Sequence, residues 1–262
     1  MMILQTDRLS IAFGGVRAID AVTIAVESGQ VFSIIGPNGS GKTTLFNLVS
    51  GLYTPDDGSI RFAGETATGL APDELARRGL SRTFQNLQIF YRMSVLENVM
   101  VGRHRHERTG ILADLLHLPS VARQNKATAE AARGALARVG LADLANRPAG
   151  SLAYGALKRL EIARALATEP MLLLLDEPAA GCNPVETQEI DSVIRSTVKD
   201  GITVVLVEHD MRLVMNISDR VHVLANGRTL AEGTPEQVRS DAAVIQAYLG
   251  VHGSQEAPSA FD

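Results

Sequence analysis

The stretch that decides the fold is Gly36-Pro37-Asn38-Gly39-Ser40-Gly41-Lys42-Thr43, which matches the phosphate-binding pattern G-x-x-x-x-G-K-[ST] at every position. The apolar, β-branched residues 31–35 precede it and predict a buried strand, and residues 42–50 follow with helical spacing up to Gly51. Glycines let backbone N–H groups face an anion, and the N-terminus of a helix adds the positive end of its dipole. The stretch therefore predicts a phosphate-binding loop between a strand and a helix.

The side chains of this loop indicate its ligand. We expect the Lys42 ammonium to contact the β and γ phosphates of a nucleotide and the Thr43 hydroxyl to bind magnesium. The other predicted phosphate contacts are Gly36, Pro37, Asn38, Gly39, Ser40, Gly41 and Thr44. The alternative is a glycine-rich turn with a surface lysine, and it is disfavoured because a strand and a helix both flank the loop.

Two carboxylates follow another strongly apolar run. Residues 171–175 predict a buried strand that delivers Asp176 and Glu177 to its carboxyl end, where parallel sheets bind ligands. We expect Asp176 to hold magnesium, directly or through water, and Glu177 to orient and deprotonate an attacking water. Taken alone, a solvated acidic turn would explain the pair better, but adjacent carboxylates beside the Lys42 loop favour a function.

A histidine and a glutamine are weaker candidates. His209 follows the apolar residues 204–207 and Glu208, so it is predicted to lie at the same sheet edge, within reach of a γ-phosphate. A lone histidine is more often structural. Gln85 is an ordinary polar loop residue when taken alone. The residues by themselves leave both roles open.

Composition excludes several classes of protein. The chain has 262 residues, 45% of them apolar and 21% charged, which is ordinary for a globular protein. A net charge of −4 argues against bulk electrostatic binding of nucleic acid. The single cysteine, Cys182, excludes an intrachain disulfide framework. No apolar run approaches the roughly 20 residues of a membrane span, and the N-terminus lacks the apolar core of a signal peptide, so we expect another chain to provide any membrane anchor.

Turn signals along the chain indicate a small β subdomain, an α/β core and a helical middle. Short strands are predicted at residues 2–4, 9–13 and 21–26, a capping box at Ser94 opens a helix, and Asn226-Gly227 predicts a hairpin. We expect a single unit over residues 1–250 and a tail at 251–262. Within that unit, the expected parts are a β subdomain (1–30 and 54–80), a core (31–53 and 160–235) and a helical subdomain (about 86–158).

Together these motifs resemble an ATP-binding-cassette (ABC) ATPase, and the resemblance covers about residues 9–250. The family's motifs occur in the family's order: Phe13, the loop at 36–43, Gln85, a signature peptide, Asp176-Glu177 and His209. The signature peptide separates this family from other phosphate-loop proteins and here reads Leu152-Ala153-Tyr154-Gly155-Ala156. The resemblance implies an α/β fold with a RecA-like P-loop NTPase core, an antiparallel β subdomain and an α-helical subdomain.

The resemblance also implies roles and cofactors, namely ATP and Mg²⁺. Phe13 is expected to stack on adenine, and Gln85 to complete the magnesium ligands Thr43 and Asp176. His209 is expected to help place the attacking water.

The signature peptide departs from the family pattern at two positions. Ala153 stands where a serine is usual, so a hydroxyl contact to the partner's γ-phosphate is missing, and Ala156 replaces a glutamine. Ala153, Tyr154 and Gly155 are still expected to present the backbone at a helix N-terminus to that phosphate. Asn183 stands where the family usually carries aspartate, and either a helix cap or a contact across the dimer would explain it.

A narrower resemblance is to the LivG-type ATPase of branched-chain amino-acid importers. Leu-Ala-Tyr-Gly before Leu-Glu-Ile-Ala-Arg-Ala-Leu carries it, as does Asp-Glu-Pro-Ala-Ala-Gly-x-Asn-Pro at 176–184. Residues 82–90 and 93–99 are also of that type. Related urea and amide importers share much of this pattern, so the solute stays open, including another amino acid.

The resemblance implies an assembly at a membrane. Two cassettes close head-to-tail over two ATP molecules, and integral-membrane permease subunits convert the cycle into alternating access. The second cassette is expected to be a different, LivF-type chain, with a homodimer as the other possibility; a solute-binding protein takes part indirectly and no nucleic acid does. The expected location is peripheral, at the cytoplasmic face of a bacterial-type inner membrane.

Two segments are expected to face that membrane partner or the membrane itself. The permease is expected to dock on about residues 86–148, with residues 87–91 in the groove. The basic run at 103–108 either touches lipid headgroups or, as blocks of charge usually do, faces water.

Three other functions compete with this interpretation. A cassette ATPase acting on DNA or the ribosome generally has two cassettes in one chain or a long coiled coil, and neither is present. A phosphate-loop kinase would leave the signature peptide at 152–156 unexplained. A nucleotide-gated binding module with little turnover is compatible with the altered signature, and measured ATPase activity separates it from a working motor.

Overall fold

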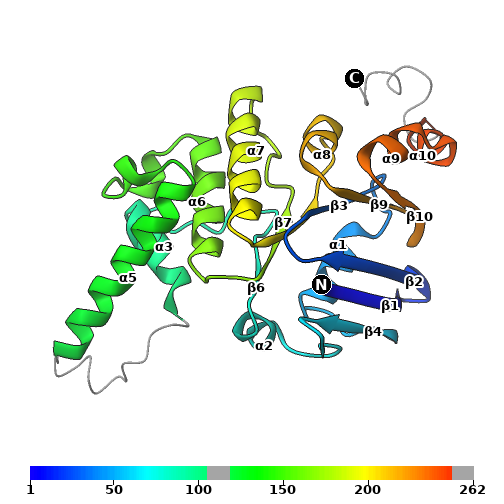
Figure 1. Cartoon of the computed structure of the whole chain (residues 1–262), viewed down its shortest axis with the longest axis horizontal. Coiled ribbons are helices and arrows are strands. Elements are labelled where there is room, and N and C mark those ends of the chain that lie inside the picture. Colours follow the sequence, from blue (N-terminus) through cyan, green and yellow to red (C-terminus); the bar gives the residue numbers. More distant parts are fainter. Residues whose placement is uncertain (105–118, 250–262) are drawn as a thin grey trace.

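The structure is a computed structural model that describes residues 1–104 and 119–249. This part of the chain contains two β-sheets with helices packed beside them (Figure 1). The smaller sheet is antiparallel, with the strand order β2-β1-β4-β5. Its strands are β1 (Met2–Phe13), β2 (Val16–Glu27), β4 (Asp57–Phe62) and β5 (Glu65–Thr66).

The larger sheet has the strand order β10-β9-β3-β8-β7-β6 and is parallel from β9 to β6, whereas β10 returns antiparallel. Its strands are β3 (Val31–Ile35), β6 (Leu80–Arg82), β7 (Leu172–Asp176), β8 (Thr203–Val207), β9 (Arg220–Ala225) and β10 (Arg228–Gly233). Every residue of β3, β7 and β8 is buried, as expected for parallel strands covered on both faces. The sheet therefore brings the carboxyl ends of these three strands to one edge, and the predicted α/β fold is confirmed.

The prediction of separate short strands near the N-terminus is wrong in one respect. Residues 2–4 and 9–13 belong to one continuous strand, β1, which pairs with β2 through several register shifts. One shift lies between Thr6 and Leu9, where Arg8 has φ of 45°. A β-bulge at this shift accommodates the polar residues Asp7 and Arg8, so the strand continues through them. The predicted hairpin at Asn226-Gly227 is confirmed, because it joins β9 to β10.

The described helices begin and end close to their sequence signals. They are α1 (Lys42–Val49), α2 (Pro72–Arg77), α3 (Val95–Gly102), α5 (Pro119–Arg138), α6 (Tyr154–Leu166), α7 (Pro184–Lys199), α8 (Met211–Ile217), α9 (Pro235–Ser240) and α10 (Ala242–Leu249), with short 3-10 turns at Ala142–Leu144 and Ala149–Ser151. The capping box before α3 is confirmed: the Ser94 hydroxyl accepts the Glu97 N–H at 3.1 Å, and the Glu97 carboxylate accepts the Ser94 N–H at 2.7 Å.

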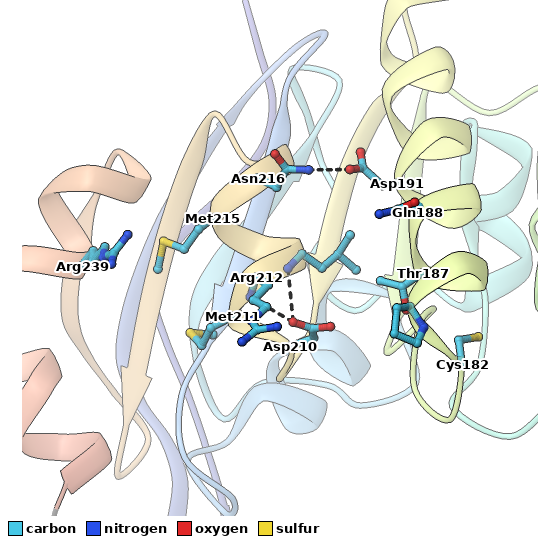
Figure 2. Close-up of a pocket in the computed structure, with 12 residues that line it drawn as sticks. Cys182, Thr187, Gln188, Asp191, Asp210, Met211, Arg212, Met215, Asn216 and Arg239 are labelled. Carbon is cyan, nitrogen blue, oxygen red and sulfur yellow. Dashed lines mark hydrogen bonds between the residues drawn. The ribbon is translucent and has the colours of Figure 1, made fainter. Parts of the chain in front are cut away.

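An open groove of about 620 Å³ lies between α7 and α8 (Figure 2). Asp210 lines it and caps α8, because its carboxylate accepts the N–H groups of Arg212 and Leu213 at 2.9 and 3.2 Å. Asn216 of α8 donates to Asp191 of α7 at 2.6 Å, which joins the two helices. The groove is thus continuous with the loop that follows β8, but its lining does not include the phosphate loop.

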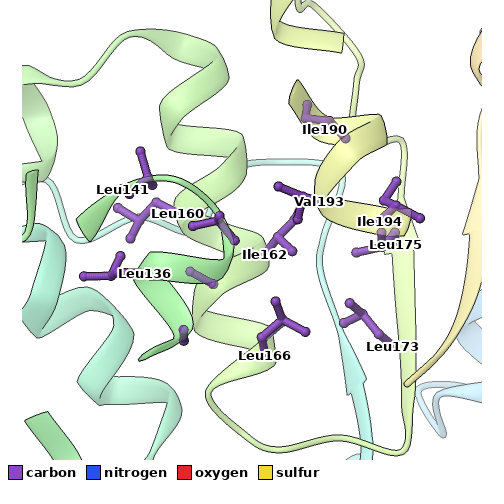
Figure 3. Packing of buried hydrophobic residues seen from close by; sticks show 14 of the residues in the cluster. Leu136, Leu141, Leu160, Ile162, Leu166, Leu173, Leu175, Ile190, Val193 and Ile194 are labelled. Atoms are coloured by element: carbon purple, nitrogen blue, oxygen red, sulfur yellow. The ribbon is translucent and has the colours of Figure 1, made fainter. Parts of the chain in front are cut away.

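Apolar clusters hold the helices and sheets together. One cluster packs α5, α6 and α7 against β7 (Figure 3) and includes Leu136, Leu160, Ile162, Leu166, Leu173, Leu175, Ile190, Val193 and Ile194. A second cluster joins α1 to both sheets through the fully buried Phe46, Phe32 and Phe62. Both elements that flank the phosphate loop are therefore fixed by packing. Among the described residues, no helix is both long and apolar enough to cross a membrane.

The predicted basic run at 103–108 is described only at its start. Residues 105–108 lie outside the described residues. The Arg103 side chain is 13% exposed; it pairs with Glu169 and donates to the Ala167 carbonyl oxygen at 3.2 Å. Arg103 therefore joins α3 to the end of α6 instead of facing lipid or bulk water.

Candidate nucleotide-binding site

The phosphate loop follows a tight path between β3 and α1. At Gly36, a Cβ would lie 2.0 Å from the Leu224 carbonyl oxygen of β9, and at Gly41 it would lie 2.6 Å from the Ala18 carbonyl oxygen of β2. Both glycines also have positive φ, 152° and 105°. Backbone from both sheets therefore excludes side chains at these two positions and fixes the course of the loop.

Lys42 begins α1, and its side chain is turned back onto the loop. It is 9% exposed, and its Nζ donates to the carbonyl oxygens of Gly36 at 2.6 Å and Pro37 at 3.1 Å. Burial lowers the pKa of Lys42, whereas the nearby carboxylates of Glu177 and Asp176 act in the opposite direction. A phosphate oxygen would be a stronger partner for this ammonium than a neutral carbonyl, because charge-assisted hydrogen bonds are about twice as strong.

Two features of the loop fit an anion. The Ser40 hydroxyl is buried, and within the described residues it has no hydrogen-bond partner. Gly41 is the N-cap of α1, so the cap residue has no side chain that could accept the N–H groups of the first turn. Buried hydroxyls and helix N-termini normally have partners, and phosphate oxygens supply them. Asn38, Gly39 and Thr43 are exposed on the same loop, where a ligand can reach them.

Asp176 is the last residue of β7 and is 4% exposed. The Arg82 guanidinium donates to its Oδ2 at 2.9 Å, and to Asn47 Oδ1 and Ser50 Oγ near the end of α1 at 2.8 and 2.7 Å. Burial raises the pKa of Asp176, and the Arg82 charge lowers it. No local sequence pattern indicates this role of Arg82, and its position three residues before Gln85 is the one signal in the sequence.

Glu177 projects from the loop after β7 with φ of 48°, a left-handed conformation that is uncommon for a residue with a side chain. Its N–H donates to the Val207 carbonyl oxygen of β8 at 2.9 Å, and its carbonyl oxygen accepts from Lys158 at 3.2 Å. Gln85 Nε2 donates to its Oε2 at 3.1 Å. Strained backbone of this kind persists where surrounding bonds hold it, often at functional sites. Lys158 is buried, and like Arg82 it is a residue of the site that no local sequence pattern indicates.

His209 lies beside this carboxylate. Its Nδ1 is 3.9 Å from Glu177 Oε2 and 3.6 Å from Glu208 Oε2, and its side chain is 62% exposed. The structure thus brings Gln85, Glu177 and His209 together, as the resemblance implies. Glu208, which no local sequence pattern indicates, is buried beside the histidine.

The predicted magnesium ligands form a donor set that fits the ion. Asp176 Oδ2 faces Arg82, which leaves its second carboxylate oxygen for a metal, and Gln85 uses its amide nitrogen toward Glu177, which leaves its oxygen. Thr43 adds an exposed hydroxyl. In the described parts of the chain no three acidic, histidine or cysteine side chains gather into a metal cluster. Mg²⁺ typically takes one or two carboxylates together with substrate phosphates, so the ion would be held jointly with a nucleotide.

The predicted adenine contact, Phe13, ends β1. Its ring is exposed and meets the edge of the Tyr53 ring, with the ring centroids 5.3 Å apart. An exposed aromatic pair of this kind offers a surface for stacking. The adenine contact itself stays a prediction.

The signature peptide contacts α7 instead of the phosphate loop of its own chain. The Gly155 N–H donates to Glu186 Oε1 at 3.0 Å, and a Cβ at Gly155 would lie 2.5 Å from Glu186 Cγ and Cδ. Ala153 is the N-cap of α6 without a side-chain cap, and Tyr154 is exposed. In the single chain the Glu186 carboxylate occupies the Gly155 N–H, and the contact of this peptide with a nucleotide bound to a second cassette stays a prediction.

Asn183 caps α7. Its Oδ1 accepts the N–H groups of Val185 and Glu186, both at 3.0 Å, and the Glu186 carboxylate accepts the Asn183 N–H at 3.0 Å. Of the two explanations that the sequence leaves open, the cap is the one present in the single chain.

The close approach at Gly36 gives a direct stability prediction. We expect Gly36→Ala to lower the free energy of unfolding by about 2–4 kcal/mol, because the new methyl group meets a carbonyl oxygen and the backbone keeps a strained φ. Gly39→Ala is the matched control: it has φ of 77° but nothing within 4 Å, so about 1 kcal/mol is expected. Urea unfolding of both variants without nucleotide measures the difference, and equal losses would contradict the packing argument.

Family models match most of the chain. The model described as ABC transporter matches residues 19–180, and the model described as branched-chain amino acid ATP-binding cassette transporter matches residues 228–254. The chain is 48% identical to the high-affinity branched-chain amino acid transport ATP-binding protein BraF of Pseudomonas aeruginosa and 45% identical to LivG of Escherichia coli K12. Each match extends over 249 residues, which is 95% of this chain and 98% of the relative.

Solved structures show the same fold. A nucleotide-free ATP-binding cassette from an ABC transporter superposes with a TM-score of 0.83 at 36% identity, and the ADP conformation of such a cassette with 0.83 at 35%. Both matches cover 95% of this chain and 99% of the other. A dimeric bacterial ABC transporter cassette superposes with a TM-score of 0.74 at 25% identity, over 89% of this chain and 99% of the other.

A phosphate loop after β3, a carboxylate pair at the end of β7 in the same sheet and a signature peptide at the start of α6 define a P-loop ATPase of the cassette class. The chain belongs to the ATP-binding-cassette transporter family. The family and the P-loop NTPase fold expected from the sequence are thereby confirmed, and with them nucleotide binding and ATPase activity.

Proposed function

We propose that this chain is the ATP-hydrolysing subunit of an importer that takes up branched-chain amino acids through a membrane permease. The ATPase role is supported by one observation: Lys42, Asp176 and Glu177 come together at one edge of the larger sheet. The negative charges of the two carboxylates interact with the Lys42 ammonium, which lies against the phosphate loop. The solute is supported by the names of relatives that are 48% and 45% identical to the chain and by the C-terminal family match.

The proposed chemistry is the transfer of a phosphoryl group to water. Water attacks the γ-phosphorus, Glu177 accepts its proton, and the bond to the β-phosphate oxygen breaks to release ADP and phosphate. Gln85 and His209, which flank the Glu177 carboxylate, keep it aimed at the water. Thr43, Gln85 and Asp176 would hold Mg²⁺, which when bound supplies neutralising charge to the phosphates.

The proposal includes the other parts of the predicted assembly. Phe13 binds adenine, and the signature peptide at 152–156 faces the γ-phosphate of a second cassette, a LivF-type chain or a copy of this one. The subunit sits at the cytoplasmic face of the inner membrane. The subdomain boundaries given above, with the helical subdomain at about 86–158, are part of the same proposal.

The proposed permease contact lies on the segment at 87–91. Phe90 and Tyr91 are exposed, and the buried Asn98 holds the segment in place. The Asn98 side chain accepts the Phe90 N–H at 2.9 Å and donates to the carbonyl oxygens of Phe90 and Ser94 at 3.0 and 2.9 Å. A rigid pair of exposed aromatic side chains suits the role of an anchor in a protein interface.

We expect the double variant Phe90→Ala/Tyr91→Ala to reduce co-purification with the permease at least 10-fold, because truncation of hot-spot aromatics typically costs about 2 kcal/mol or more. Nucleotide affinity of the isolated cassette is expected to stay within about 2-fold. Met171→Ala removes a similarly exposed apolar side chain, directly before β7, and serves as the control. Unchanged permease capture by the double variant would place the contact elsewhere.

The experiment that tests the whole proposal is transport. The chain is co-expressed with a candidate permease, a second cassette and a solute-binding protein from the same organism, and the complex is reconstituted in vesicles. ATP-dependent uptake of labelled leucine, isoleucine or valine supports the proposal. Uptake of urea, an amide or another amino acid instead would correct the solute and keep the ATPase role. ATP binding without turnover in the complete complex would favour a nucleotide-gated binding module.

A further inference from the structure

We propose that Glu208 is a positioning residue that sets His209 against Glu177 by joining the two loops that carry them. This inference rests on the proposed function, because it concerns how the hydrolytic group is arranged. Glu208 directly follows β8 and is 1% exposed, so its carboxylate has no access to substrate.

Each carboxylate oxygen of Glu208 accepts backbone N–H groups from a different loop. Oε1 accepts the Ala179 N–H at 2.9 Å, two residues beyond Glu177. Oε2 accepts the His209 N–H at 2.9 Å and the Asp210 N–H at 3.3 Å. A buried carboxylate is costly unless hydrogen bonds satisfy it, and here three donors do so.

The bond to Ala179 has a neighbour that reinforces it. The Glu177 N–H donates to the Val207 carbonyl oxygen at 2.9 Å, so the loop after β7 is bound at two successive points to the end of β8. These two points fix the start of the Glu177 side chain relative to the start of the His209 side chain. The His209 side chain is largely exposed, and its Nδ1 lies 3.6 Å from Glu208 Oε2 and 3.9 Å from Glu177 Oε2.

The same cluster continues into α8. Asp210, whose N–H is held by Glu208, caps α8 with its own carboxylate (Figure 2). Glu208 therefore connects the loop after Glu177, the histidine and the first turn of α8. The arrangement requires a carboxylate because glutamine has only one acceptor oxygen. Its NH₂ group would then face either the Ala179 N–H or the N–H groups of His209 and Asp210, none of which can accept a hydrogen bond.

The test is Glu208→Gln in the full chain, assayed in its transporter complex. We expect kcat to fall about 10-fold or more, because buried N–H donors left unsatisfied would shift the two loops relative to each other, with KM and nucleotide affinity within about 2-fold of wild type. A purely structural role would not produce this split. The decisive readout is the same substitution in a His209→Ala background, where it is expected to change kcat less than 2-fold.

Two further variants complete the design. Glu232→Gln, on β10, is the matched control because both oxygens of the Glu232 carboxylate also have partners. These partners are on β9: Arg220 at 2.8 Å and the buried His222 at 3.0 Å. It is expected to leave kcat unchanged. Glu208→Asp keeps the charge and both acceptors on a shorter stem, so it keeps the inference testable if the glutamine variant does not fold, and an intermediate kcat is expected.

The outcomes separate this inference from the proposed function. If wild type hydrolyses ATP, and Glu208→Gln either leaves kcat unchanged or lowers it equally with and without His209, the inference is overturned and the ATPase role stands. If the wild-type complex hydrolyses no ATP, the proposed function fails first. Loss of nucleotide affinity in both Glu208 variants would also overturn the inference, because it would assign the residue to binding.

Discussion

Replacement of Glu177 by glutamine is expected to slow ATP hydrolysis by about 10²–10⁴-fold, the usual effect of removing a general base. The amide has nearly the shape of the carboxylate and can still meet the Gln85 side chain, which lies 3.1 Å away. It cannot accept the proton of the attacking water, so the chemical step fails while the nucleotide contacts of the loop at 36–43 remain. Bound ATP should then persist, and the pair of cassettes should stay closed over it.

Two measurements check this expectation: single-turnover hydrolysis, and size-exclusion chromatography with ATP and magnesium to detect a trapped dimer. Glu169→Gln is the control, because Glu169 is another glutamate with positive φ, 53°, but it is exposed and pairs with Arg103. A Glu177→Gln variant that hydrolyses ATP at the normal rate would remove Glu177 from its proposed role. A slow variant that forms no ATP-dependent dimer would contradict the shared site.

Replacement of Lys42 by alanine is expected to weaken ATP binding by about 10–150-fold, the equivalent of one lost hydrogen bond to a charged group. The Lys42 ammonium is already placed at the start of α1, with the Gly36 carbonyl oxygen 2.6 Å from its Nζ, so phosphate binding requires little reorganisation. Its loss also removes a positive charge that interacts with the carboxylates of Asp176 and Glu177. Both effects act against a triphosphate.

Equilibrium binding of a fluorescent ATP analogue measures this loss directly. Lys199→Ala removes an exposed lysine at the C-terminal end of α7, away from the site, and this variant is expected to bind ATP as wild type does. Thermal unfolding without nucleotide controls for folding. Unchanged ATP affinity in Lys42→Ala would contradict the assignment of the loop at 36–43 as the phosphate cradle.

The principal site residues could be predicted because they occur in local patterns. The loop at 36–43 has a fixed spacing, and Asp176-Glu177 follows an apolar strand, so a short window contains all the information needed. Arg82 and Glu208 were missed for the opposite reason. Each acts through partners far away in the sequence, since Arg82 reaches Asp176 and Glu208 reaches Ala179, and only the pairing of β6, β7 and β8 brings these residues together.

The signature peptide also combines a feature that local sequence predicts with a contact that only the fold reveals. Its residues predict a helix N-terminus with a backbone open to an anion, and α6 does begin there. The Glu186 carboxylate, 31 residues further along the chain, takes the Gly155 N–H, and no local pattern indicates that contact. A ligand that uses this donor must compete with a carboxylate that also belongs to the cap of α7.

The amino-acid sequence alone determined that a phosphate-loop pattern lies between a buried strand and a helix, because apolar periodicity and glycine spacing act over a few consecutive residues. Only the tertiary structure decided how the carboxylates are held, since hydrogen bonds between strands depend on register. The contact of Arg82 with Asp176 and the contact of Glu208 with His209 both depend on that register. The strand order of the larger sheet, and not any single motif, sets the geometry in which the site would act.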